Sequence, residues 1–311
     1  MKYVIIGGTG SWGQELTKQL LLKTHGRERI IIFSRNEFNQ VVMKREFNND
    51  KLEFIIGDVR DKEAVTKVTQ GANVVFILSA LKHIPICEDQ PDEAFKTNVL
   101  GTQNVIEACK LNKVGKVLFC STDKAANPIN FYGITKAMSE KLILSADDCT
   151  STRFSCVRGG NVIGSRGSAI PYFIDMIKKG TIYLTNPNMT RFFMTIPHAI
   201  KLLLTALESE YRGIFIMKMK STSLMDLVDI LQEKHGKANI EVIGERAGEK
   251  THEILVTPEE AKHLYHYNDD FFLYSLDNLD LLKAHIESYS SFDNQMRVNE
   301  LKQLLTEAGY L

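Results

Sequence analysis

The stretch VIIGGTGSWGQEL, residues 4–16, joins a short β-branched run to a segment with helical periodicity through three evenly spaced glycines. Gly7 permits a tight turn, Gly10 lets the backbone approach a pyrophosphate, and Gly13 lets the helix pack on the strand. The free N–H groups at the start of that helix then meet the negative charge. The pattern predicts a strand–turn–helix unit that binds a dinucleotide.

The alternation of short apolar runs and amphipathic segments continues through the first half of the chain. Continuous apolar strands separated by helices indicate a parallel sheet that is covered on both faces. The predicted fold class is therefore α/β, with a doubly wound parallel Rossmann sheet. The expected strands are residues 2–7, 29–34, 52–58, 73–79, 116–121 and 153–159, and the expected helices include residues 93–111 and 131–146.

After residue 160 the alternation becomes irregular. We expect a dinucleotide-binding domain at residues 1–157, and at residues 158–311 mainly a smaller substrate lobe that returns once to the main sheet. The expected elements of this half are the helices IPYFIDMIKKG and SLMDLVDILQEKHG and the strands YRGIFIMKM and NIEVIG.

Composition limits the class of protein. The 38 basic and 38 acidic side chains among 311 residues give no global field that would attract nucleic acid or an anionic membrane. No apolar run reaches the length of a membrane span, and the run before the glycines is too short for a signal peptide. The five cysteines lack C-x-x-C spacing, which favours reduced thiols and a cytoplasmic location. The eight histidines form no ligand-like pair, so we expect no metal site.

The end of the second expected strand, FSRNE, bears on the choice of cofactor. An NAD site usually places an acid there against the ribose diol, whereas this chain has Ser34 and Arg35. A hydroxyl and a guanidinium suit a 2′-phosphate and favour NADP. The alternative is that Arg35 is a solvated loop residue. The other expected cofactor contacts in this half of the chain are Thr9, Ser11, Asp58, Val59 and Ala80.

The stretch STDKAANPINFYGITK, residues 121–136, gathers titratable side chains just past the fifth expected strand. Tyr132 and Lys136 are four residues apart and share one face of a helix, so the ammonium can lower the pKa of the tyrosine. Chance spacing on an amphipathic helix is the alternative. Thr122 ends the strand and can hydrogen-bond a substrate hydroxyl.

Several motifs resemble the extended short-chain dehydrogenase/reductases that act on nucleotide sugars, among them GGTGSWG and NVLGTQNVIEAC. FSRNEFNQ, ALKHIPICE, STDKAANPIN, GNVIGSRGS, MTRFFMT and GEKTHEIL resemble, more closely, the UDP-N-acetylglucosamine 4,6-dehydratases of the soluble, configuration-inverting, pseudaminic acid type. The matches run from about residue 4 to residue 256, in the order of the family. Residues 257–311 carry none of these motifs.

The resemblance implies roles for the titratable cluster. Tyr132 would deprotonate the sugar C4 hydroxyl during its oxidation by NADP⁺, which is regenerated at the end of each cycle and stays bound. Lys124 would then remove the C5 proton, and Asp123 would protonate the departing C6 hydroxyl. Lys124 must be neutral to act as a base, and Lys136, the oxidised nicotinamide and burial are expected to depress its pKa while Asp123 is protonated. A surface ion pair between Asp123 and Lys124 is the alternative.

The resemblance also implies positions for the substrate. Lys82 and Asn98 would lie beside the cofactor and the sugar. Taken alone, Lys82 could equally be a solvated lysine and Asn98 a capping or turn asparagine. Arginines suit a pyrophosphate and a glutamate suits ribose hydroxyls, but each arginine alone could be an ordinary solvated side chain. The remaining residues expected to bind the UDP-sugar are Asn161, Arg166, Arg191, Arg246 and Glu249.

The chain departs from the family pattern at two places. It has Gly159 where the family usually has tyrosine, which could change how the keto intermediate is held, and Ala247 where proline is common. A related reductase, an epimerase, a dehydratase that releases a 5,6-ene, and a non-catalytic NADP-binding regulator remain as alternatives. Surplus apolar residues on helices 93–111 and 131–146 predict a homo-oligomer, a dimer or larger.

Overall fold

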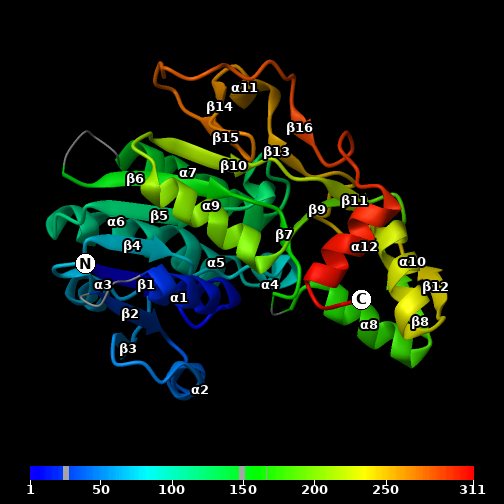
Figure 1. Cartoon of the computed structure of the whole chain (residues 1–311), viewed down its shortest axis with the longest axis horizontal. Helices are drawn as coiled ribbons and strands as arrows, with labels where there is room; N and C mark the ends of the chain where they lie inside the picture. Colours follow the sequence, from blue (N-terminus) through cyan, green and yellow to red (C-terminus); the bar gives the residue numbers. More distant parts are fainter. Residues whose placement is uncertain (24–27, 147–150, 166) are drawn as a thin grey trace.

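The computed structural model describes residues 1–23, 28–146, 151–165 and 167–311, coloured from blue to red along the chain in Figure 1. Within these residues one central sheet has the strand order β14-β15-β10-β6-β5-β4-β1-β2-β3. Strands β1 to β6 and β10 run parallel, which confirms the predicted doubly wound α/β class. The strands of this sheet are β1 (Lys2–Ile6), β2 (Arg29–Ser34), β3 (Leu52–Ile56), β4 (Val74–Ile77), β5 (Lys116–Cys120), β6 (Arg153–Arg158), β10 (Gly213–Met217), β14 (Leu264–His266) and β15 (Phe271–Tyr274).

Helices cover both faces of this sheet. They are α1 (Ser11–Lys23), α2 (Glu37–Phe47), α3 (Lys62–Thr69), α6 (Gly101–Leu111), α7 (Phe131–Ala146) and α9 (Ile196–Glu208). On one face α3, α6 and α7 pack side by side, and on the other α1 packs against α9 (Figure 1). This double cover explains why β4 and β10 are apolar and buried along their whole length. None of the helices in the described ranges combines the length and apolar character needed to cross a membrane.

The predicted helix at residues 93–111 is not one continuous α-helix. It consists of the end of α5 (Pro91–Phe95), a π-helical turn (Lys96–Leu100) and α6. Single π-helical turns are rare and occur frequently at functional sites. This turn carries Asn98, one of the residues expected beside the cofactor.

The second half of the chain returns to the main sheet twice, whereas the sequence predicted one return. The first return is α9 with β10, and the second is the hairpin of β14 and β15. The apolar run FFLY of β15 is buried because it pairs with the open edge of β10. β14 and β15 are antiparallel because the connection 267–270 is too short for a parallel crossover.

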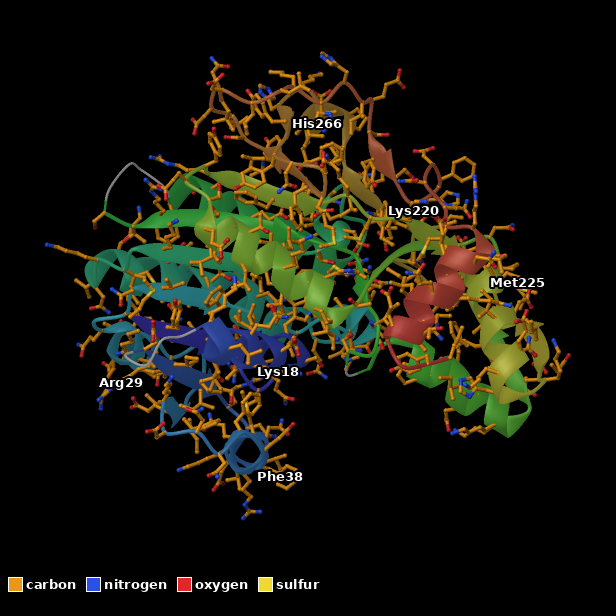
Figure 2. The ribbon with its side chains drawn as sticks, in the orientation of Figure 1. Lys18, Arg29, Phe38, Lys220, Met225 and His266 are labelled. Carbon is orange, nitrogen blue, oxygen red and sulfur yellow. The ribbon has the colours of Figure 1, made fainter. Side chains whose placement is uncertain are left out.

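A smaller lobe has an apolar core of its own, to which Phe173, Leu227 and Leu301 contribute. Its main elements are α8 (Ala169–Lys179), α10 (Leu224–His235), α12 (Val298–Glu307), β7 (Asn161–Val162), β8 (Thr181–Leu184), β9 (Thr190–Met194), β11 (Ser221–Ser223) and β12 (Asn239–Val242). In Figure 2, the label Met225 marks α10 of this lobe, and the label Phe38 marks α2, one of the helices beside the central sheet. The boundary at residues 157 and 158 remains a prediction.

Candidate active site

The glycine turn between β1 and α1 is shaped as the sequence predicts. Gly7 has φ +84°, and a Cβ atom there would lie 2.6 Å from the backbone nitrogen of Ser79. A Cβ atom on Gly13 would lie 2.3 Å from the carbonyl oxygen of Gly8. Only glycine therefore allows the turn to approach β4 and the helix to approach the turn.

The surroundings of this turn fit a bound dinucleotide. The first turn of α1 contains no acidic residue, so its N–H groups can meet a phosphate. The backbone oxygen of Thr9 accepts a hydrogen bond from Gln14, and Ser11 forms part of the wall of a pocket of about 720 Å³. The hydroxyls of Ser79 and Ser121, just past β4 and β5, are buried and find no partner among the described residues. Buried polar atoms of this kind are expected where a polar ligand covers the sheet edge.

The structure brings Arg35 and Asp58 together from the ends of β2 and β3. The Nη1 atom of Arg35 lies 3.8 Å from Oδ2 of Asp58, and the Arg35 side chain remains 53 % exposed. Burial alone raises the pKa of Asp58, but Arg60 and Arg35 outweigh it and hold this pKa below its usual range. The Ser34 hydroxyl accepts a hydrogen bond from Gln40 at 3.0 Å.

Val59 lies on the other side of Asp58, where it is buried against α6. A Cβ atom on Gly101, the first residue of that helix, would lie 2.7 Å from Cγ1 of Val59. Asp58 and Val59 are thus neighbours in the segment after β3, and the side chain of Val59 packs against the start of α6.

Asn98 fixes the loop that contains Ala80 and Lys82. Its amide oxygen accepts a hydrogen bond from the backbone nitrogen of Leu81 at 2.8 Å. Its amide nitrogen donates to the carbonyl of Leu81 at 2.9 Å and to Thr135 of α7 at 3.0 Å. Asn98 is thus fully engaged with the protein and acts on the site by tying this loop to α7.

Tyr132 and Lys136 lie on one face of α7, as predicted, and the structure shows that both are buried. Burial lowers the pKa of Lys136 to about 8. Its ammonium donates to the carbonyl of Cys120 at 2.5 Å and lies 3.8 Å from the ring centroid of Phe119.

The expected lowering of the pKa of Tyr132 is wrong for this structure. Burial raises this pKa, and a hydrogen bond with Thr122 offsets the rise only in part. The ammonium of Lys136 does not counter the effect of burial because it is directed at the carbonyl of Cys120.

Asp123 and Lys124 form a buried pair, not the surface ion pair that was the alternative. Asp123 is fully buried, and the side chain of Lys124 is 15 % exposed. The Nζ atom of Lys124 donates to Oδ1 of Asp123 at 3.0 Å, and the hydroxyl of Thr122 donates to the same oxygen at 3.0 Å. The other carboxylate oxygen, Oδ2, has no hydrogen-bond partner within the described ranges.

Burial shifts the pKa values of Asp123 and Lys124 in opposite directions. It raises the pKa of Asp123, as a proton donor requires. It lowers the pKa of Lys124, but the charges of Asp123 and Glu253 outweigh burial and leave that pKa raised. The expected depression of the pKa of Lys124 is therefore wrong for this structure, because two carboxylates face its ammonium.

Glu253 is a site residue that the sequence did not single out. It precedes β13 (Ile254–Val256) and is buried, with Oε1 3.2 Å from Nζ of Lys124. Burial raises the pKa of Glu253, but Lys124, Arg191 and Lys250 outweigh burial and lower it. The motif GEKTHEIL contains this glutamate, but no local spacing shows that it meets a lysine more than a hundred residues earlier.

Two of the residues expected to bind substrate join the same cluster. The amide oxygen of Asn161, at the start of β7, accepts a hydrogen bond from Lys124 at 3.3 Å. Arg191 of β9 has Nε 3.9 Å from Glu253 and donates to the carbonyls of Thr190 and Thr251. The guanidinium of Arg191 is therefore largely committed to the protein.

Two more of the expected substrate residues share the loop that precedes Lys250 and Glu253. Arg246 and Glu249 sit on one loop with their charged atoms 4.0 Å apart, and the Arg246 side chain is 56 % exposed. Asn130 ties this loop to the start of α7, since its side chain donates to the carbonyl of Gly248 at 2.8 Å. Arg166 lies outside the described residues.

Known proteins resemble this chain over most of its length. A family model described as polysaccharide biosynthesis protein matches residues 3–275. The chain belongs to this polysaccharide biosynthesis protein family. The UDP-N-acetylglucosamine 4,6-dehydratase (inverting) of Campylobacter jejuni is 40 % identical over 86 % of the chain and 80 % of the relative, which confirms the resemblance seen in the motifs.

Other relatives of this chain carry different names. The UDP-glucose 4-epimerase of Rickettsia rickettsii is 39 % identical over 99 % of the chain and 96 % of the relative. The X-ray structure of Pen from Bacillus thuringiensis superposes with a TM-score of 0.93 at 37 % identity, covering 100 % of this chain and 98 % of that one. The names thus include both dehydratases and epimerases.

Gly159, which stands where the resemblance led us to expect a tyrosine, lies in a closely packed part of the chain. A Cβ atom on Gly159 would lie 2.4 Å from the terminal methyl group of Met194, and one on Gly160 would lie 2.5 Å from Cβ of Phe192. The side chain of Met194 thus occupies the space next to Gly159. A tyrosine at position 159 requires Met194 to move.

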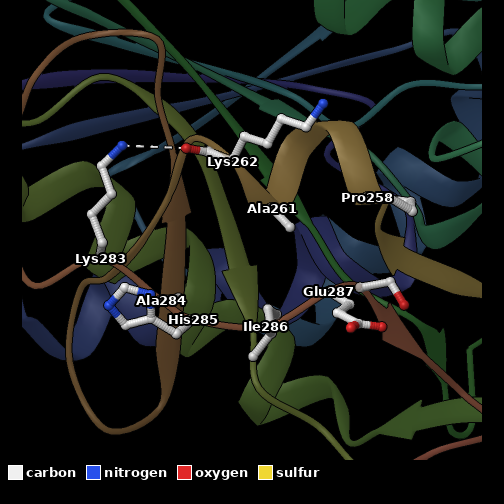
Figure 3. A pocket seen from close by; sticks show the side chains of 9 residues that line it. Pro258, Ala261, Lys262, Lys283, Ala284, His285, Ile286 and Glu287 are labelled. Atoms are coloured by element: carbon white, nitrogen blue, oxygen red, sulfur yellow. Dashed lines mark hydrogen bonds between the residues drawn. The ribbon is translucent and has the colours of Figure 1, made fainter.

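Figure 3 shows a further hollow, of about 670 Å³, in the C-terminal part of the chain. It lies between α11 (Pro258–Ala261) and residues 283–288, with Lys262, His285 and Glu287 in its wall. None of the cofactor, substrate or catalytic candidates lines it, so it is separate from the Asp123 cluster.

Proposed function

We propose that this protein is an NADP-dependent UDP-N-acetylglucosamine 4,6-dehydratase that inverts C5. The observation that carries the proposal is the buried pair of Asp123 and Lys124 beside Tyr132. An elimination needs an acid for the departing hydroxyl and a base for a carbon-bound proton, and the pair supplies both. An epimerase needs neither group, because Tyr132 alone can move the proton of the C4 hydroxyl. The C. jejuni relative supports the dehydratase.

Tyr132, Lys124 and Asp123 each have a separate role in the proposed reaction. A bound nicotinamide dinucleotide would supply the reversible two-electron oxidation at C4. In its phenolate form, which the positive charge of a bound oxidised nicotinamide would favour, Tyr132 beside Thr122 accepts the proton of the C4 hydroxyl. The C4 ketone then acidifies the C5 proton. Lys124 removes that proton, and Asp123 protonates the C6 hydroxyl, which leaves as water. The two electrons taken from C4 would return from the bound dinucleotide as a hydride to C6. A proton added to C5 from the other face then gives an inverted UDP-2-acetamido-2,6-dideoxy-hexos-4-ulose, a precursor of surface sugars of the pseudaminic acid type.

One incubation distinguishes the candidate functions. The purified protein is mixed with UDP-N-acetylglucosamine without added cofactor, and the products are followed by NMR. The proposal requires a 4-keto-6-deoxy sugar with inverted C5. A C4 epimer that keeps its C6 hydroxyl would indicate an epimerase, and turnover only with stoichiometric NADPH would indicate a reductase. A 5,6-ene product would indicate that the intermediate is released before C6 is reduced. No turnover at all would favour a non-catalytic NADP-binding regulator.

The preference for NADP is tested at Arg35. Replacing Arg35 with aspartate is expected to weaken NADPH binding on the order of tenfold or more, since a charge-assisted contact to the 2′-phosphate is lost and Asp58 gains a like-charged neighbour. NADH binding should change far less. Fluorescence titration with both dinucleotides measures this, and Arg29→Asp, at the other end of β2, is the matched control. Equal losses for NADPH and NADH would contradict the assignment.

We also propose that the protein is a dimer or a larger oligomer. The side chains of Leu100, Leu111, Ile134 and Met138 are exposed although they are apolar. On α7, Ile134 and Met138 lie about 200° around the helix from the buried Tyr132 and Lys136, so they form an outward apolar face.

Sedimentation tests this oligomeric state. The wild-type protein is expected to sediment well above 35.2 kDa at micromolar concentration. Met138→Glu should weaken the association, because it buries a charge in the proposed interface. Leu22→Glu, at a more exposed apolar site on α1, should leave it intact. A stable wild-type monomer would contradict the proposal.

A further inference from the structure

Lys124 lies between two carboxylates that come from opposite halves of the chain. Its Nζ atom is 3.0 Å from Oδ1 of Asp123 and 3.2 Å from Oε1 of Glu253. Asp123 belongs to the turn after β5, whereas Glu253 precedes β13 and reaches the site from the C-terminal segment. The proposed mechanism uses only the first of these carboxylates.

The backbone of Glu253 is held in place independently of its side chain. Its nitrogen donates to the hydroxyl of Ser291 at 2.8 Å, and the nitrogen of Ser291 donates back to its carbonyl at 2.8 Å. The hydroxyls of Ser291 and Thr190 are 2.6 Å apart, which joins this contact to β9. The carboxylate is therefore presented to Lys124 by a fixed scaffold.

Charged groups from three segments of the chain meet around Lys124 and Glu253. Lys250 has Nζ 3.7 Å from Oε2 of Glu253, and Arg191 lies 3.9 Å from Oε1. With Asp123, the cluster thus holds two carboxylates and three cations, and Asn161 contributes a neutral amide. All of these side chains except that of Asn161 are ionisable, so removal of any one charge changes the protonation of the others.

The proton count of Asp123 and Lys124 determines whether they can act. With one proton between them, the two residues exist either as carboxylate and ammonium or as carboxylic acid and amine. The second form contains the acid and the base that the elimination requires, and it arises when one proton moves across the 3.0 Å between Nζ and Oδ1. With two protons the amine is lost, and with none the acid is lost.

We propose that Glu253 is a positioning residue for this elimination, holding the ammonium of Lys124 against Asp123 and keeping one shared proton on these two residues at the working pH. This inference rests on the proposed function. Its electrostatic basis is that the charge of Glu253 raises the pKa of both Asp123 and Lys124.

The test is the pH dependence of C5 exchange. The holoenzyme and UDP-N-acetylglucosamine are incubated in D₂O, and deuterium incorporation at C5 is measured from about pH 4 to about pH 12, a range that spans the ordinary pKa values of a carboxyl group and a lysine amine. Glu253→Gln removes the charge at nearly constant size. Both limbs of the pH profile should then move to lower pH, by about one unit, since one charge within 4 Å is lost.

Two further variants control for structural damage. Lys250→Met removes a cation from the same cluster, so both limbs should move in the opposite direction, to higher pH. Glu259→Gln removes an exposed charge on α11 and should leave the profile unchanged. Limbs that stay in place in both Glu253→Gln and Lys250→Met, with only the rate reduced, would overturn the proposal.

A measurement without turnover separates this inference from the proposed function. Acetylation of Lys124 by acetic anhydride, followed by mass spectrometry across pH, reports when its amine becomes neutral. The labelling midpoint should fall in Glu253→Gln and rise in Lys250→Met. If the wild-type protein exchanges no C5 deuterium, the proposed function fails. If exchange occurs but neither the labelling midpoint nor the limbs move, only the role of Glu253 fails.

Discussion

Replacing Lys124 with alanine is expected to reduce the rate of dehydration by a factor on the order of a hundred or more, the usual contribution of a positioned acid–base group. In the proposed reaction Lys124 takes the carbon-bound proton, and no other amine in the described structure lies within hydrogen-bond distance of Asp123. Exchange of solvent deuterium into C5 should be lost with dehydration. Oxidation at C4 should persist, because Tyr132 does not depend on Lys124, so a 4-keto sugar that retains its C6 hydroxyl should accumulate to the amount of enzyme.

Lys116→Ala is the matched control for this variant. Lys116 lies at the opposite end of β5. Its side chain is 25 % exposed, and its ammonium donates to the carbonyls of Leu207 and Ser209. It should therefore lose a comparable lysine packing contact without losing activity. Thermal melting of both variants shows whether the uncompensated Asp123 weakens the fold. C5 exchange at the wild-type rate in Lys124→Ala would mean that another residue is the base.

Replacing Tyr132 with phenylalanine is expected to stop the reaction one step earlier, again by a factor on the order of a hundred or more. The phenol oxygen, hydrogen-bonded to Thr122, is the proposed acceptor of the C4 hydroxyl proton. Without it no 4-keto sugar should form, and C5 exchange should be lost as well because the C5 proton is acidic only next to the ketone. Quenched reactions analysed by mass spectrometry measure both quantities.

Tyr265→Phe is the matched control, because it also removes a buried hydroxyl, one that donates to the carbonyl of Asp277 at 3.0 Å. It should retain activity. The two site variants must also differ from each other: Lys124→Ala accumulates a keto sugar and Tyr132→Phe does not. A keto sugar formed by Tyr132→Phe at the wild-type rate would exclude the tyrosine as the proton acceptor.

Local sequence determined most of the fold. The six strands of the first half were predictable because strands buried on both faces have continuous apolar runs, as β4 shows along its whole length and β5 in its three central residues. Gly7 and Gly13 were informative because a Cβ atom at either position would overlap the neighbouring backbone. The second return to the sheet was not predictable, because a short run such as FFLY at β15 does not show which sheet edge it will pair with.

The candidate site was likewise predictable from the sequence only in part. The spacing of Tyr132 and Lys136 determined that they share a helix face, since four residues complete about one turn. The adjacency of Asp123 and Lys124 in the chain likewise placed the acid beside the amine. Only the tertiary structure decided the charge states, because they depend on burial and on Glu253, which approaches Lys124 from a distant segment. Electrostatic contacts between distant segments leave no periodic pattern or spacing in the sequence. The sequence therefore showed which side chains could react, but not the protonation state that the fold gives them.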